Sequence, residues 1–274
     1  MTQIHTEKRW DPCIDVVGTY ALMHLACFGV LWTGVTRTGL AVFAGSFVLR
    51  MFGLGVGYHR YFAHRAFKTS RAMQFVLALV GVLSMQRGPL WWAQTHRDHH
   101  RAADTPDDIH SPRYHGFLYS YSGWFSDRRH HTTDLARVGD LAAFPELVWL
   151  DDSRVYAVPM LLYALALYTA FGGEGLLWGI AVSTVMLWHV THWIQSFSHS
   201  AGGYRRFESR DNSRNHWLVG VVSLGEYHNN HHAAPSSAMQ GVVWWEIDVG
   251  YLVVRAMSAV GLVWDVRTHP GRGK

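Results

Sequence analysis

Eight histidines lie in three short motifs, and two of these motifs share the same spacing. The first motif contains His59 and His64. The second is HRDHH at residues 96–100 and the third is HNNHH at residues 228–232. Imidazole binds zinc, copper, iron and nickel, and a single zinc ion is satisfied by about four ligands. These eight side chains therefore predict a centre that holds two metal ions: His59, His64, His96, His99, His100, His228, His231 and His232.

The spacing within each motif predicts how the histidines divide between two metals. In the second and third motifs, the first and last histidines lie one turn apart on an α-helix, while the middle one points elsewhere. Each of these motifs can therefore serve both metals. His59 and His64 would lie roughly 140° apart around a continuing α-helix, so we expect them to reach different metals.

Several other histidines show no regular spacing. We expect them to be surface or hydrogen-bonded residues rather than metal ligands, as a polar residue usually is. They are His5, His115, His130, His131 and His269.

The elements that must position the motifs are apolar segments. The chain is 49% hydrophobic and only 16% charged, which favours a lipid environment. Four segments, at about residues 14–35, 40–57, 156–172 and 176–197, have the length needed to cross a hydrocarbon core of roughly 30 Å. Arg50 lies near enough to the end of its segment for its side chain to extend to the membrane surface.

The four segments form two hairpins with short loops, Thr36–Gly39 and Gly172–Gly175. We therefore predict an all-α integral membrane protein that forms a single domain over residues 1–274. Four transmembrane helices are expected, with a helical cap that carries the histidine motifs.

The distribution of basic residues predicts the orientation in the membrane. Of the 24 lysines and arginines, only Arg37 falls in a hairpin loop. The positive-inside rule therefore places both termini, and the histidine motifs with them, in the cytoplasm. Residues 75–85 are too few for a span, and a fifth crossing there would separate the first two motifs. We expect this segment to lie in the membrane interface.

Composition gives little support to other classes of protein. The net charge is only +4, and no run of basic residues alternates with aromatic ones, so we expect no nucleic-acid partner. The two cysteines cannot form a disulfide framework, which favours a reducing compartment.

Long blocks around the motifs make the chain resemble the membrane fatty-acid desaturases, in particular the bacterial relatives of the stearoyl-CoA desaturases. The blocks are GYHRYFAHRAFKT (57–69), GPLWWAQTHRDHHRAADTPDDIHSP (88–112), GFLYSYSGW (116–124) and SRNHWLVGVVSLGEYHNNHHAAP (213–235). The resemblance implies a non-haem centre of two Fe²⁺ ions, dioxygen as co-substrate and a fatty-acyl substrate held in a kinked tunnel. It also implies a location in the bacterial inner membrane.

The resemblance adds His199 as a ninth metal ligand. Four residues earlier, Gln195 stands where the family has an asparagine that contacts iron through a water, and this spacing would stack the two side chains on one helix face. His192 occupies a position that is commonly aromatic, so it is either a neighbour of the site or a polar residue near the interface. The approach to His228 is one residue shorter than is usual in the family.

Liganding histidines are normally oriented by hydrogen bonds from their other ring nitrogen. By proximity in sequence, the candidates for this role are polar residues beside the motifs. For Asp104 to Asp108, a solvated turn is an equally good interpretation. The candidates are Asp98, Asp104, Asp108, Glu226, Asn229 and Asn230.

The expected reaction inserts a cis double bond into an acyl chain. Side-chain acids and bases cannot remove hydrogen from an unactivated chain, so the oxidising power must come from dioxygen at a redox-active metal, which zinc is not. The chain has no glycine fingerprint for a nucleotide, no haem motif and no cysteine cluster. A separate donor is therefore expected, and the resemblance implies a ferredoxin, a rubredoxin or a cytochrome with its reductase.

Two alternatives to desaturation remain open. The same scaffold can support a hydroxylase, an acetylenase or a decarboxylating oxidase, because substrate placement decides the product. A non-catalytic metal-binding membrane protein is less well supported, because transport usually needs polar ligands inside the membrane and these motifs lie outside the segments. The acyl carrier, whether CoA, carrier protein or lipid, is not indicated by the sequence.

Overall fold

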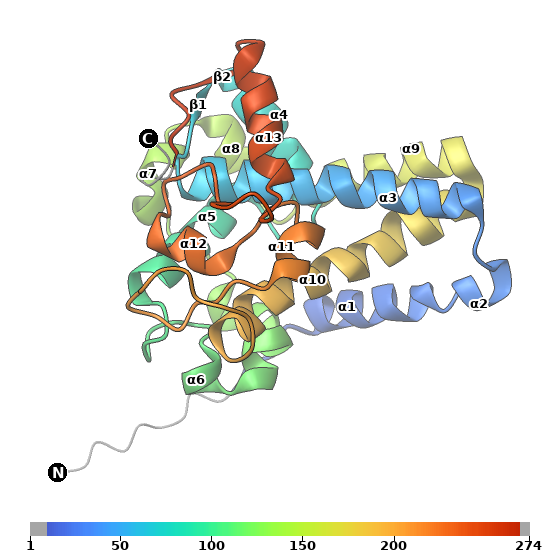
Figure 1. Ribbon diagram of the computed structural model, residues 1–274. Helices are drawn as coiled ribbons and strands as arrows, with labels where there is room; N and C mark the ends of the chain where they lie inside the picture. The colour runs from blue at the N-terminus through green and yellow to red at the C-terminus, as the bar shows by residue number, and fades with distance from the viewer. Residues whose placement is uncertain (1–9, 269–274) are drawn as a thin grey trace.

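The computed structural model describes residues 10–268, and nearly all of their regular structure is helical (Figure 1). The α-helices are α1 (Ile14–Cys27), α2 (Val30–Thr33), α3 (Arg37–Phe52), α4 (Arg71–Val82), α5 (Pro89–Ala102), α6 (Pro112–His115), α7 (Gly139–Ala142), α8 (Pro145–Asp151), α9 (Ala157–Leu176), α10 (Ser183–Ser196), α11 (Trp217–Val222), α12 (His228–Ala233) and α13 (Val249–Ala259). The π- and 3₁₀-helices are η1 (Gly53–Ala63), η2 (Tyr119–Gly123), η3 (Trp124–Ser126), η4 (Arg128–His130), η5 (Leu135–Val138), η6 (Leu177–Val182) and η7 (Phe197–His199). Two short strands, β1 (Lys68–Thr69) and β2 (Val263–Trp264), pair antiparallel.

Three helical runs of the described chain are long and apolar enough to cross a membrane. They are Ile14–Thr33, Arg37–Ala63 and Ala157–His199, of 20, 27 and 43 residues. In Figure 1 they extend together to the right, whereas the shorter helices gather at the left into a cap. The helical class and the apolar runs agree with the sequence prediction.

The third run is folded back on itself at Gly172. This residue has φ 60° and ψ −142°, a conformation that is strained for any residue with a Cβ atom. After the break, a Cβ atom on Gly175 would lie 2.2 Å from the carbonyl oxygen of Leu167, which precedes the break. The two arms therefore pack side by side as a helical hairpin, and they correspond to the predicted segments 156–172 and 176–197.

The other hairpin turns earlier than predicted. The side chain of Thr36 accepts a hydrogen bond from the backbone nitrogen of Gly39 at 2.9 Å and so caps α3, which begins at Arg37 rather than at residue 40. The hydroxyl of Thr36 also donates to Glu174 at 2.7 Å. This bond joins the tips of the two hairpins at the end of the molecule that is far from the cap.

The second run continues past its predicted end as the π-helix η1. Backbone nitrogens in this helix donate hydrogen bonds to the carbonyl five residues earlier rather than four. The backbone nitrogen of His64, for example, donates to the carbonyl of His59 at 3.2 Å. A Cβ atom on Gly53 would lie 2.4 Å from the carbonyl oxygen of Val80 in α4. The small residue therefore lets α4 pack closely against the start of η1.

Helix α4 occupies the segment predicted to lie in the interface. It has 12 residues and falls short of the length of a span, as expected. Its placement in the membrane interface stays a prediction.

Arg50 in α3 corrects an expectation. Its side chain is fully buried and donates to the carbonyl of Leu83 and to the hydroxyls of Ser183 and Thr184, at 2.6, 2.7 and 2.7 Å. It therefore ties α3 to α10 and to the end of α4 instead of extending to a surface, because these three acceptors lie within its reach.

Candidate metal centre

Nine histidines converge where the cap meets the long helices. They form two groups, and within each group the ligand nitrogens all lie within 4.8 Å of one another. The five-histidine group consists of His59, His64, His96, His100 and His231. The four-histidine group consists of His99, His199, His228 and His232. Together they contain all nine histidines predicted from the sequence.

Helices α5 and α12 each send side chains to both groups. In α5, His99 joins the four-histidine group while the other two histidines join the five-histidine group. In α12 only His231 joins the five-histidine group. The helical spacing of the two related motifs thus divides their histidines as the sequence predicted.

The expectation for the first motif was wrong. His59 and His64 belong to the same group, and their ring centroids lie 4.9 Å apart. The reason is the π-helix η1, in which a separation of five residues is close to one turn instead of well past one.

Within each group, ring nitrogens of different histidines face one another. In the five-histidine group, Nε2 of His231 lies 2.9 Å from Nε2 of His59 and 2.7 Å from Nε2 of His100. In the four-histidine group, Nε2 of His228 lies 2.7 Å from Nε2 of His199. A neutral imidazole has a single N–H donor, so these rings cannot all pair with one another. A shared cation satisfies this many converging nitrogens best.

Three further Nε2 atoms are buried and find no hydrogen-bond partner within residues 10–268. They belong to His64, His99 and His232. Unpartnered buried nitrogens are costly unless something binds them. The residues therefore fit two metal ions with imidazole ligands.

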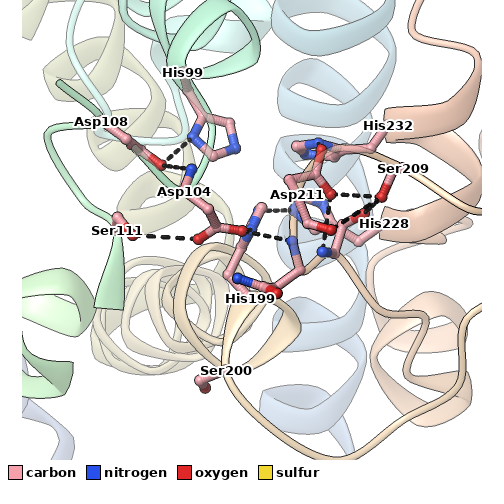
Figure 2. A network of polar contacts seen from close by, with 12 residues as sticks. His99, Asp104, Asp108, Ser111, His199, Ser200, Ser209, Asp211, His228 and His232 are labelled. Carbon is pink, nitrogen blue, oxygen red and sulfur yellow. Dashed lines mark hydrogen bonds and ion pairs between the residues drawn. The ribbon is translucent and has the colours of Figure 1, made fainter. Parts of the chain in front are cut away.

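Carboxylates hold the opposite ring nitrogen of four of these histidines. In the four-histidine group, Asp108, Asp104 and Asp211 accept from Nδ1 of the ring that each one faces, and Figure 2 shows this network. The pairs are Asp108–His99 at 3.1 Å, Asp104–His199 at 2.9 Å, Asp211–His232 at 2.8 Å and, in the five-histidine group, Glu226–His59 at 2.6 Å. Each bond keeps the proton on Nδ1 and leaves the Nε2 lone pair free for a metal.

Three of the predicted orienting residues make other contacts. Asp98 pairs with Arg101 and with Arg137, the latter at 2.9 Å, because its position in α5 lies away from the two groups. Asn229 accepts from the backbone nitrogens of residues 206 and 207, and Asn230 donates to the carbonyl of Gln240. Both asparagines therefore stabilise the loops around α12, and neither makes a hydrogen bond to the side chain of a grouped histidine among the described residues.

Three residues near the groups were not predicted. Asp211 comes from the long loop between η7 and α11, and Gln240 lies with its Nε2 3.4 Å from Nδ1 of His231. His110 is buried, with its ring centroid 4.4 Å from that of His99. No spacing rule connects the first two to the motifs, whereas His110, two residues after Asp108, lies within a block that the sequence had already marked.

Burial lowers the pKa of most of the grouped histidines. The pKa values of His64, His96, His100, His228 and His231 lie well below 6.5, and that of His232 is lowered to about 4. These rings are neutral at neutral pH, which is the form that binds metal.

Glu226 stays ionised although it is buried. Burial would raise the pKa of its carboxyl group, but the charge of Arg60, at 2.5 Å, helps to hold that pKa below its ordinary value. Arg60 also pairs with Asp248 at 3.1 Å. A buried charge network therefore supports the partner of His59.

A cavity of about 430 Å³ runs beside both groups. His96 and His99 line it, and Trp92 stacks on the ring of His96 with centroids 4.8 Å apart. Gln86 accepts from Trp92 at 3.2 Å and donates to Thr191 at 3.0 Å, which fixes this part of the wall. The cavity has the size and the largely apolar lining of a small-molecule site.

Gln195 and His192 both line this cavity, and neither belongs to a histidine group. His192 is therefore a neighbour of the site. Gln195 donates to the carbonyls of Ser120 and Tyr121, at 3.4 and 3.3 Å. Because α10 ends at Ser196 and a 3₁₀ turn follows, Gln195 and His199 do not share one continuous α-helix face, contrary to expectation.

The histidines without regular spacing lie outside both groups where they are described. His115 pairs with the carbonyl of Asp108, while His130 and His131 contact Tyr119 and the carbonyl of Phe125. His5 and His269 lie outside the described residues.

Comparison with known proteins identifies similar chains. Residues 38–262 match the fatty acid desaturase family. The sn-2 palmitoyl-lipid 9-desaturase of Nostoc sp. (strain 36) is 33% identical over 273 residues, covering 97% of this chain and 93% of the relative. Delta-9 acyl-lipid desaturase 1 of Arabidopsis thaliana is 35% identical over 271 residues, with 95% and 86% covered. The hex-5-enoyl-[acyl-carrier protein] acetylenase of Moorena producens (strain JHB) is 33% identical over 281 residues, with 93% and 83% covered.

Proposed function

Because the chain belongs to the fatty acid desaturase family, we propose that its two histidine groups hold two Fe²⁺ ions that use dioxygen to place a cis double bond in a fatty-acyl chain. The enzyme is an oxidoreductase that desaturates fatty-acyl chains. The observation that carries the proposal is the pair of converging histidine groups beside a cavity.

The reaction takes one hydrogen atom from each of two adjacent carbons. Dioxygen, two electrons and two protons balance the equation, and the products are the alkene and two water molecules. Bound iron supplies the redox chemistry that activates dioxygen, which a redox-silent ion such as zinc does not. The acyl chain is oxidised, and a separate donor supplies the two electrons that the equation requires.

The residues of the chain bind the metals, orient the metal ligands and the acyl chain, and exclude water. We propose as metal ligands all nine grouped histidines, with the carboxylates of Asp104, Asp108, Asp211 and Glu226 fixing the tautomers of four. Trp92 and its neighbours hold the acyl chain against the groups and keep water out. A water-mediated contact between Gln195 and a metal stays a prediction.

We propose four membrane crossings, with the cap and both termini in the cytoplasm of a bacterial inner membrane. Support comes from the fold at Gly172, which divides the longest apolar run into two arms. The two hairpin tips meet through Thr36 and Glu174 at the end opposite the cap. Cysteine labelling from each side of sealed vesicles, at residue 35 and at Arg101, tests this orientation.

The electron donor is proposed to be a ferredoxin, a rubredoxin or a cytochrome with its reductase. Support for a separate donor comes from the sequence, which has no motif for a nucleotide, haem or iron–sulfur cofactor. The names of the relatives include acyl-lipid, acyl-CoA and acyl-carrier-protein enzymes, so all three carriers enter the test.

The deciding experiment supplies the purified, iron-loaded enzyme with one saturated acyl chain on each carrier, together with a donor system. Mass spectrometry should find an internal alkene and oxygen uptake, and both should be lost in His99→Ala and His231→Ala. Hydroxylated or terminally modified chains would instead assign another oxidation on this scaffold. Bound metal without oxygen uptake would assign a non-catalytic protein.

One relative suggests a second substrate for the same assay. The enzyme from Moorena producens is named as an acetylenase. A monoenoyl chain should therefore be tested beside the saturated one. An alkyne from the monoenoyl chain, with no reaction of the saturated chain, would favour acetylenase over desaturase.

A further inference from the structure

A polar pair interrupts the wall of the cavity on α10. His192 and Gln195 are three residues apart, so they lie on the same side of the helix, and both line the cavity. His192 is only 6% exposed, and its Nδ1 atom is buried without a hydrogen-bond partner in the described part of the chain. The other ring nitrogen, Nε2, is less buried and also makes no hydrogen bond within residues 10–268, so it is the nitrogen that a ligand in the cavity can reach.

Aromatic rings hold the imidazole of His192 in place. Phe125 stacks on it with centroids 5.1 Å apart, Tyr20 stacks at 5.9 Å, and Tyr121 meets it edge-on at 5.2 Å. The ring therefore cannot easily turn away from the cavity to find another partner.

The neighbouring polar groups are already used. Nδ1 of His24 donates to the carbonyl of Tyr20 at 2.7 Å, because that carbonyl can only accept. In the neutral ring, Nε2 of His24 must then accept from Nε2 of His189 at 3.0 Å, and Nδ1 of His189 must accept from the hydroxyl of Tyr121 at 2.8 Å. This series of hydrogen bonds uses the hydroxyl proton of Tyr121, so Tyr121 cannot also donate a hydrogen bond to His192.

The orientation of the Gln195 amide is fixed in the same way. Its NH₂ group faces the carbonyls of Ser120 and Tyr121, and both of these groups are acceptors. The oxygen Oε1 is therefore the part of the amide that remains for a ligand. The pair thus offers an imidazole nitrogen that can donate and an amide oxygen that can accept.

We propose that the cavity takes an acyl chain that carries a hydroxyl group, recognised by His192 and Gln195. The hydroxyl oxygen accepts from the imidazole N–H, and the hydroxyl hydrogen is donated to Oε1 of Gln195. A methylene or an alkene offers neither of these bonds. This inference rests on the proposed function, because it takes the cavity to be the acyl site.

The test is a binding measurement on the full-length, iron-loaded protein without an electron donor, so that no chain is converted. The affinities of a saturated acyl chain and of the same chain with one hydroxyl group, moved along a series of positions, are compared by equilibrium binding of labelled chains. The wild type should prefer one hydroxylated chain by about 2- to 10-fold, the effect of one or two net hydrogen bonds. His192→Phe should lose this preference.

Two further variants control the comparison. His192→Asn keeps a hydrogen-bonding group and should retain part of the preference. Trp193→Phe changes the adjacent residue of α10, which is 39% exposed and is not part of the cavity lining, and it should leave the preference unchanged. If the wild type binds all chains equally, or if His192→Phe keeps the preference, the inference is wrong and the site holds water alone.

Failure of this inference can be told apart from failure of the proposed function. Iron-loaded wild type and His192→Phe are assayed with both chains and a donor system. Desaturation by both proteins with the same ratio of kcat/KM for the two chains refutes only the hydroxyl contact. No desaturation of any chain refutes the proposed function, while the binding preference still decides the inference.

Discussion

Replacing Asp211 by asparagine should weaken one metal site and spare the other. Oδ2 of Asp211 accepts from Nδ1 of His232 at 2.8 Å, while Oδ1 accepts from Ser209 and from the backbone nitrogen of Ser213 at 2.8 and 2.9 Å. Asparagine can keep the Oδ1 contacts, but it then presents an NH₂ donor to His232. The ring must move its proton to Nε2, which removes the lone pair that faces the four-histidine group.

The expected size of the effect follows from the loss of one orienting contact. Such a loss typically costs 10- to 100-fold in metal affinity, or about 1.4 to 2.7 kcal/mol. Asp211 touches no member of the five-histidine group, so that site should keep its metal. Over a suitable range of chelator, the variant should fall from about two bound iron ions per chain to about one.

The assay is metal content after dialysis against graded chelator, with Asp98→Asn as the matched control. Asp98 stands between two grouped histidines in sequence but pairs with Arg101 and Arg137. Its variant should titrate like the wild type. Retention of both metals by Asp211→Asn, or parallel loss of both, would refute the assignment of two separately held ions.

Three other perturbations have defined outcomes. Glu226→Gln removes the carboxylate that holds His59, so it should weaken metal in the five-histidine group by about 10- to 100-fold in the same chelator titration, with the remaining metal unaffected. Gly172→Ala should lower the free energy of unfolding in detergent by about 1–3 kcal/mol through backbone strain, whereas Gly173→Ala, with no positive φ, should not. Burial would raise the pKa of Glu246, but the hydrogen bonds that its carboxylate accepts hold that pKa below its ordinary value of 4.5. The contribution of Glu246 to stability is therefore present above pH 4.5 and is lost as the pH falls through the folded-state pKa. Melting temperatures measured as the pH falls from about 5 to about 3 should therefore drop more steeply for the wild type than for Glu246→Gln, and equal slopes would contradict this account.

The parts of the structure that the sequence predicted are those governed by local periodicity. The spacing of His96 and His100 on one helix fixes which ring points where, and hydropathy marks the long runs without reference to distant residues. The partners of the histidines follow another rule. Asp98 is adjacent to His99 in sequence but pairs with Arg137, whereas Asp211 is remote in sequence but accepts from His232. The conformation of the loops decides which carboxylates reach the histidines.

The prediction for the first motif, His59 and His64, was wrong for a different reason. The glycine-rich segment GLGVG winds as a π-helix with α4 packed closely against it, and the α-helical repeat does not describe such a segment. A prediction based on the α-helical repeat therefore placed His64 on the wrong side of the axis.

This π-helix ties the number of residues between His59 and His64 to the type of helix that they occupy. Loss of one residue between them would leave the two histidines four apart, and they would then share one face only if the segment rewound as an α-helix, as His96 and His100 do in α5. By contrast, the loops that supply Asp211 and Gln240 can change in length with only local adjustment. Within η1, an insertion or deletion would instead change which type of helix brings the two ligands together, so residue count there acts as part of the metal site.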